Sequence, residues 1–129
     1  MIFLRKSDVL AMHARAIREH GGASGLRDEA ALESAIVAAE NRRAYEGAGL
    51  AECASAYAYH LTLAHAFVDG NKRVGAIAGV AFVFANGGEL SSDDDELAAM
   101  IFAIAAGSVQ RDAVDEWFRR RVHEPSEDT

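Results

Sequence analysis

Apolar side chains recur at three- and four-residue spacings along most of the chain, which is the pattern of helices that bury one face. Paired glycines at 21–22 and at 87–88 interrupt this pattern and mark helix ends. Ser7 and Asp28 precede apolar runs and can act as N-caps. The first three predicted helices run from Ser7 to about His20, from Asp28 to a break at Asn41, and from about Leu50 to Ala66. A fourth follows the turn at 69–71 and ends at about Asn86, a fifth begins at the acidic residues 91–95, and a sixth runs from about Ala113 to Val122.

Two segments depart from a simple amphipathic pattern. The stretch from Asn41 to Gly49 carries arginines, an aromatic residue and two glycines, which predicts an exposed loop or a short hairpin. The run from Val74 to Ala85 is apolar on all sides, which predicts a buried helix at the centre of the molecule. Gly75 and Gly79 lie one turn apart on that run and would let a neighbouring helix pack closely.

Composition supports a helical domain. The chain has 129 residues, the size of one domain, and half of them are hydrophobic. Alanine is abundant and there is one proline, a composition that favours helices. We therefore expect a compact all-α domain over residues 1–122, followed by a flexible acidic tail at 123–129.

Charge and hydropathy exclude several classes of function. The formal net charge of −7 repels phosphate backbones, so direct binding to nucleic acid is not expected. The longest apolar run, Val74 to Ala85, is shorter than the roughly 20 residues that span a bilayer, so no membrane association is expected. Cys53 is the single cysteine and is expected in the core, so no internal disulfide can form and a reducing, cytoplasmic location fits.

The residues most suggestive of chemistry form one run, His65-Ala66-Phe67-Val68-Asp69-Gly70-Asn71-Lys72-Arg73. Gly70 permits a tight turn, and the first N–H groups of the helix beyond it lack partners and favour an anion. Lys72 and Arg73 add positive charge at this helix N-terminus, where cations oppose the helix dipole. This conflict with a local rule indicates a functional anion site, and we expect the anion to be phosphate.

Each residue of the run has a role in phosphate chemistry. His65 can accept a proton from an attacking hydroxyl near neutral pH. Asp69 offers the hard oxygen that Mg²⁺ takes together with substrate phosphates. Phe67 can anchor the loop in the core. The set predicts phosphoryl or nucleotidyl transfer, with phosphates held by Gly70, Asn71, Lys72 and Arg73.

Ordinary structural interpretations exist for the same residues. A histidine near a helix end is commonly a cap, the Asp-Gly-Asn sequence alone is a common turn, and two adjacent cations alone are a solvated patch. Their joint spacing favours a site. His60 lies five residues before His65, which is not a metal-binding spacing on a helix. The acids from Asp93 to Asp95 suit a helix start better than a calcium loop.

The run from His65 to Arg73 resembles the signature of the Fic/Doc family, in which His, Phe, Asp or Glu, Gly or Ala, Asn, Lys or Gly, and Arg recur at this spacing. The resemblance extends to Ser24–Asp28 and Leu32–Ala35, and it covers residues 1 to about 122. It implies the Fic fold, a compact helical bundle with a short flap. Arg43-Ala44-Tyr45-Glu46 looks like this flap, so Arg42 to Gly49 are expected to bind the target as an added strand.

Particular positions distinguish branches of the family. Members that transfer AMP usually carry glycine at position 72 and a second arginine at position 76, whereas this chain has Lys72 and Ala76. Ala66 likewise replaces a proline common among those members, although Gly70 is shared with them. The chain thus resembles the Doc-type branch, which implies transfer of the ATP γ-phosphate.

The resemblance implies a toxin of a toxin–antitoxin system. Such a protein is a kinase-like phosphotransferase that uses ATP and Mg²⁺ to modify a hydroxyl side chain of a protein target such as elongation factor Tu, which arrests translation. His65, Asp69, Lys72 and Arg73 are its expected catalytic residues, with Asp69 as the metal ligand. No inhibitory motif is evident in the chain, so a cognate antitoxin is implied. The alternatives are a Fic-type AMP transferase and a catalytically silent Fic-fold binding module.

Overall fold

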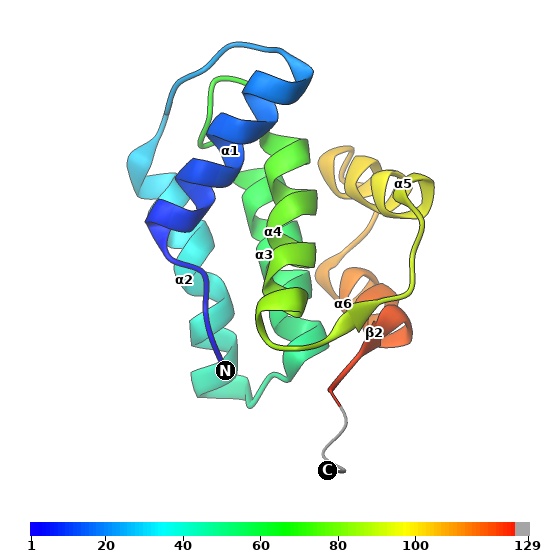
Figure 1. The fold of residues 1–129 in the computed structure, drawn as a ribbon. Coiled ribbons are helices and arrows are strands. Elements are labelled where there is room, and N and C mark those ends of the chain that lie inside the picture. Colours follow the sequence, from blue (N-terminus) through cyan, green and yellow to red (C-terminus); the bar gives the residue numbers. More distant parts are fainter. Residues whose placement is uncertain (126–129) are drawn as a thin grey trace.

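The structure is a computed structural model that describes residues 1–125. Within these residues the chain forms six helices and one two-stranded sheet, as expected for an all-α fold (Figure 1). No helix in this part of the chain is both long enough and apolar enough to cross a membrane. The elements are α1 (Lys6–His20), α2 (Glu29–Glu46), α3 (Leu50–Ala64), α4 (Asn71–Ala85), β1 (Glu89–Leu90), α5 (Asp94–Ala105), α6 (Arg111–Arg121) and β2 (Val122–His123).

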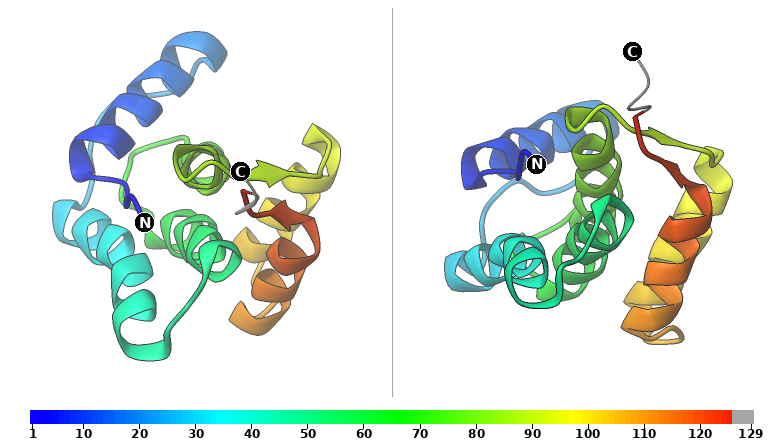
Figure 2. Two further views of the ribbon diagram at one scale, coloured as in Figure 1. Left: turned by 60° about the horizontal axis from the view of Figure 1, so that its bottom comes forward. Right: turned by 90° about the horizontal axis from the view of Figure 1, so that it is seen from below.

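Helices α3 and α4 lie side by side at the centre, with α1 and α2 on one side and α5 and α6 on the other (Figures 1 and 2). A Cβ at Gly75 would come within 2.2 Å of Thr62 Oγ1 on α3, so no larger residue fits there. A Cβ at Gly79 would lie 3.4 Å from both the Ala54 oxygen and the Ala58 Cβ. The predicted close approach is confirmed, and the neighbour that it admits is α3.

The starts of the helices show which polar side chains act as caps. Asp28 accepts a hydrogen bond from the Ala31 N–H at 3.0 Å, so the predicted cap of α2 is confirmed. Ser7 does not cap α1. That helix starts one residue earlier, because the carboxylate of Asp8 accepts the N–H of Arg5 at 2.8 Å and stabilises the turn there.

The expectation of an exposed loop or hairpin from Asn41 to Gly49 is wrong, because α2 continues to Glu46. Gly47, with φ of 67°, adopts the left-handed conformation that ends the helix. The inward-facing Arg42 explains the extra turn, since its buried side chain meets a partner on α6. Because residues up to Glu46 are helical, this region supplies no flap strand. Tyr45 lies near the end of the helix and is 85% exposed.

The chain continues after α6 as the short strand β2. His123, expected to begin a flexible tail, pairs with Glu89 across the antiparallel β1–β2 sheet, and its ring lies 2.7 Å from the Ser91 hydroxyl. Residues 126–129 of the expected tail lie outside the described residues.

A buried ion pair joins α2, α3 and α6. Arg42 donates to both carboxylate oxygens of Asp115, at 2.9 and 2.7 Å, and Ser55 of α3 donates to the same carboxylate at 2.6 Å. The two charged side chains are only 7% and 3% exposed. Burial by itself raises the pKa of Asp115, but the hydrogen bonds from Arg42 and Ser55 and the charge of Arg42 outweigh it, so the pKa lies below its ordinary value.

Replacing the Asp115 carboxylate tests how much it contributes to the stability of the fold. We expect Asp115→Asn to lower the free energy of unfolding by about 3–5 kcal/mol, because the buried guanidinium of Arg42 loses its counter-charge. Urea unfolding at pH 7 measures the effect. Glu116→Gln, on the exposed face of the same helix, is the control and should change stability by less than about 0.5 kcal/mol. Equal stability of Asp115→Asn and the wild type would contradict the expectation.

The same pair predicts a pH dependence. The folded-state pKa of Asp115 lies below its ordinary value of 3.8, so the stabilisation is fully present above that value. It is lost as the pH falls through the folded-state pKa. The wild type should therefore lose more stability than Asp115→Asn between pH 5 and about pH 2, measured by urea unfolding at each pH.

Candidate active site

The run singled out in the sequence forms the turn between the two central helices. α3 ends at Ala64, and His65 follows in the left-handed conformation, with φ of 50°. Among residues 1–125 it is the only residue other than glycine with positive φ. Such a backbone is uncommon for histidine and places the exposed His65 at the mouth of the turn. Gly70, with φ of 80°, then directs the chain into α4.

The turn is fastened to the core by Phe67, as expected. Its side chain is 2% exposed. The Asn71 side chain closes a ring around it, because its Oδ1 accepts the Phe67 N–H and its Nδ2 donates to the Phe67 oxygen, both at 3.0 Å. The side-chain amide of Asn71 therefore holds the loop. The expected contact of Asn71 with phosphate falls to its backbone N–H.

A second clamp comes from α1. The ring of His13 stacks on Phe67 with 3.8 Å between ring centroids and an angle of 9° between planes. Its Nε2 lies 2.7 Å from the Asp69 carbonyl oxygen. His13 is 4% exposed, so this contact is sheltered from water.

Residues 22–28, which we call the cover segment, run beside the turn (Figure 1, upper part). Leu26 and Phe67 form an isolated antiparallel bridge. The N–H groups of Arg27 and Asp28 donate to the Ala66 oxygen at 2.7 and 2.9 Å, and the Val68 N–H donates to the Gly25 oxygen at 3.0 Å. The segment that lies against the loop is therefore residues 22–28, not the residues from Arg42 to Gly49.

The carboxylate of Asp69 is held between the turn and the cover segment. Its Oδ1 accepts the Gly70 N–H at 2.8 Å, and its Oδ2 accepts the Ala23 N–H at 3.3 Å. Asp69 is exposed, and each oxygen retains a lone pair for a further ligand. The carboxylate is thus fixed in orientation and still open to a cation.

The start of α4 offers donors for an anion. The first helical bond runs from the Val74 N–H to the Gly70 oxygen at 3.0 Å, so the N–H groups of Asn71, Lys72 and Arg73 precede the helical ladder. The side chains of Lys72 and Arg73 are exposed, and neither forms an ion pair with any residue in the described part of the chain.

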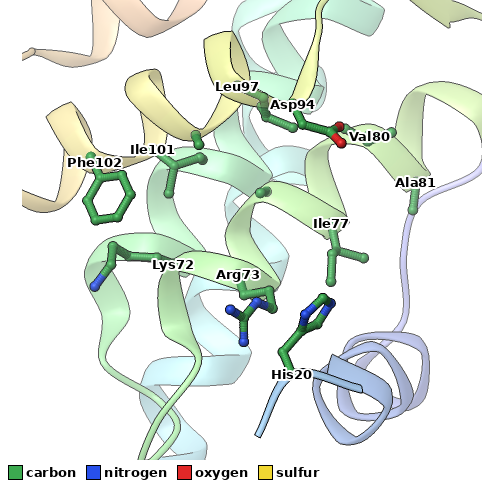
Figure 3. A pocket seen from close by; sticks show the side chains of 12 residues that line it. His20, Lys72, Arg73, Ile77, Val80, Ala81, Asp94, Leu97, Ile101 and Phe102 are labelled. Atoms are coloured by element: carbon green, nitrogen blue, oxygen red, sulfur yellow. The ribbon is translucent and has the colours of Figure 1, made fainter. Parts of the chain in front are cut away.

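Both cations line one end of a groove of about 630 Å³ between α4 and α5 (Figure 3). The Lys72 ammonium lies 5.5 Å from the ring centroid of Phe102 on α5, and Arg73 shares the groove with His20 of α1. The remaining walls are mostly apolar and come from Ala76, Ile77, Val80, Ala81, Asp94, Leu97, Ala98 and Ile101.

Comparison with known proteins places the chain in a family. The model of the Fic/DOC family matches residues 3–83, which is more than half of the chain. The chain belongs to the Fic/DOC family. It is also 29% identical over 121 residues to the Protein kinase doc of Escherichia phage P1, a match that covers 93% of this chain and 95% of that protein. The family match includes α1, the cover segment and the loop.

Two parts of this Fic/DOC site were not recognised from the sequence. His13 was not among the residues singled out in the sequence. The signal that could have found it is a histidine in line with Val9 and Ala16, where a neutral core residue is usual. The cover segment is marked by Gly22 and Gly25, whose positive φ values fit a chain that must pass close to the loop.

A pair of neighbouring glycines tests the contact between the cover segment and Asp69. A Cβ at Gly22 would lie 2.7 Å from Asp69 Oδ2, whereas a Cβ at Gly21 would meet nothing within 4 Å. Both have positive φ, so alanine at either site should cost about 1–3 kcal/mol of stability through backbone strain. Only Gly22→Ala should also move the carboxylate. The measurement is the NMR shift of the Ala23 and Gly70 amides, which should change in Gly22→Ala and not in Gly21→Ala.

Proposed function

We propose that the chain is a Doc-like toxin, a cytoplasmic phosphotransferase that moves the γ-phosphate of ATP to a hydroxyl side chain of a protein target. The observation that carries the proposal is the grouping on one turn of an exposed histidine, a fixed carboxylate and a helix N-terminus with two cations that form no ion pair with another residue of 1–125. Membership of the Fic/DOC family and similarity to the Protein kinase doc of Escherichia phage P1 support it. Elongation factor Tu is the target that we propose to test first.

In the proposed reaction His65 accepts the proton of the target hydroxyl. The hydroxyl oxygen forms a bond to the γ-phosphorus as the bond from that phosphorus to the β–γ bridging oxygen breaks, and ADP leaves. The N–H groups of α4, Lys72 and Arg73 stabilise the negative charge of the transferring group. Little covalent chemistry is asked of the protein, so positioning and charge account for most of the catalysis.

The residues present fit a bound Mg²⁺. Residues 1–125 contain no cluster of three or more histidine, cysteine, aspartate or glutamate side chains that could enclose a metal alone. Mg²⁺ prefers one or two carboxylates together with substrate phosphates and water, and Asp69 presents one such carboxylate. When bound, the ion neutralises phosphate charge. The work of Asp69 is to hold its carboxylate in the orientation set by Gly70 and Ala23.

The choice of γ-phosphate over AMP transfer is supported by the groove beside the loop. Ala76 lines it where AMP-transferring members carry an arginine, and Lys72 occupies the place of a glycine. AMP transfer is the second candidate, because both reactions use the same base, metal ligand and phosphate donors.

The groove also supports an antitoxin partner. Its apolar walls lie between α4 and α5, and Lys72 and Arg73 stand at one end (Figure 3). An antitoxin helix with apolar side chains on one face and a carboxylate beside these cations would fit it and cover the start of α4.

Transfer is tested with ATP labelled on either the α- or the γ-phosphate, incubated with the protein and either purified elongation factor Tu or a bacterial extract. Label from γ alone supports the kinase, and label from α establishes AMP transfer instead. Absence of label from both, with a folded protein that binds ATP, would favour the silent binding module.

The base is tested by His65→Ala. We expect transfer to fall about 10²–10⁴-fold, because the hydroxyl loses its proton acceptor. The side chain is exposed, so the melting temperature should stay close to that of the wild type. Growth arrest by this variant at wild-type expression would contradict the role given to His65.

The metal ligand is tested by Asp69→Asn, which keeps the shape of the side chain and removes its charge. We expect half-saturating Mg²⁺ to rise about tenfold or more in an ATP-binding titration, since an amide is a poorer ligand for a hard dication. Asp95→Asn, an exposed acid on α5, is the control. An unchanged titration would leave Asp69 with a purely structural role in the turn.

A further inference from the structure

His13 contacts the active loop from a helix that carries no part of the loop itself. Its Nε2 lies 2.7 Å from the Asp69 carbonyl oxygen, and its ring stacks on Phe67 at 3.8 Å. A carbonyl oxygen only accepts hydrogen bonds, so Nε2 carries the hydrogen and His13 is the donor. The imidazole therefore makes two contacts with the loop at once, one polar and one apolar.

The polar contact holds a peptide group next to Gly70, a residue that permits more than one backbone orientation. The Asp69 carbonyl and the Gly70 N–H belong to the same peptide unit. Its N–H donates to Asp69 Oδ1 at 2.8 Å, while its oxygen accepts from His13 on the other side. Gly70 tolerates both signs of φ, so backbone sterics alone leave this peptide free to rotate. Rotation would place an oxygen where the N–H now meets the carboxylate, and the carboxylate would have to move.

We propose that His13 is a positioning residue that locks the Asp69–Gly70 peptide and thereby fixes both the Asp69 carboxylate and the entry into α4. It touches no reacting atom in this role. Among residues 1–125, no other side chain donates a hydrogen bond to the Asp69 carbonyl oxygen. Asn71 holds the peptide groups of Phe67, and the cover segment reaches Asp69 only through its carboxylate. The structural role of His13 does not depend on the proposed function of the loop. Only its effect on the transfer reaction rests on that function.

Two variants separate the polar from the apolar contact. His13→Gln retains an N–H donor near the position of Nε2 and loses the stacked ring. His13→Phe retains a ring on Phe67 and loses the donor. Val9→Ala is the control, because Val9 is fully buried on the same helix and its loss should destabilise the fold without reaching the peptide.

The first readout needs no activity. We expect the imidazole ¹⁵N spectrum of the wild type to show His13 with a protonated Nε2. Hydrogen-exchange protection of the Gly70 amide should fall about three- to tenfold in His13→Phe, relative to amides in α3, and stay near the wild-type value in His13→Gln. Val9→Ala should lower the protection of Gly70 and of α3 together.

The second readout uses the loaded enzyme. In His13→Phe the single-turnover transfer rate at saturating ATP and Mg²⁺ should fall about 10²-fold, and His13→Gln should recover most of it, because displacement of fixed groups by about 1 Å has this effect.

Three results would overturn the proposal. They are a His13 ring protonated on Nδ1 alone, unchanged protection of the Gly70 amide in His13→Phe, and a loss of Gly70 protection relative to α3 in Val9→Ala that equals the loss in His13→Phe. If the wild type transfers nothing, the proposed function fails, and the spectrum and the amide protection still decide the role of His13.

Discussion

The close approach of α3 and α4 is the constraint on which the rest of the structure depends. It exists because Gly75 and Gly79 present no side chain to α3, and at Gly75 even a methyl group would collide with Thr62. Two helices in such contact fix the separation of their joined ends, and the turn between them has little freedom. The packing of α3 against α4 therefore restricts the loop that carries His65 and Asp69, independently of the hydrogen bonds within the loop.

Around the central pair, polar contacts add to the apolar packing that attaches the remaining helices. Near the loop, α1 contributes His13 and the cover segment adds backbone hydrogen bonds. Away from the loop, Asp115 of α6 forms a buried ion pair with Arg42 of α2 and accepts a hydrogen bond from Ser55 of α3. The site is thus built at the end of the molecule where packing, stacking and backbone bonding coincide, while the ion pair secures the fold away from the loop.

Local pattern was sufficient for much of the fold. Helical periodicity, the Asp28 cap and the two glycines of α4 were visible in the sequence, because each depends on neighbours within a few residues. The long α2 was not, since the inward turn of Arg42 makes sense only with a partner 73 positions away. The residues of the loop were also visible as a set of candidates, from the unusual cations at a helix start. Their supports were not, because His13 and the cover segment reach the loop through tertiary contacts that no spacing encodes.

The two main walls of the groove differ in their relation to the family model. One wall is α4, which lies almost wholly within the part of the chain that the family model matches, while the facing wall is α5, beyond that match. Substitutions along α5 can reshape the groove without altering α4. If the groove holds the proposed antitoxin, changes confined to α5 would alter which antitoxin binds while the loop stays the same, so several such chains could coexist in one cell without cross-recognition.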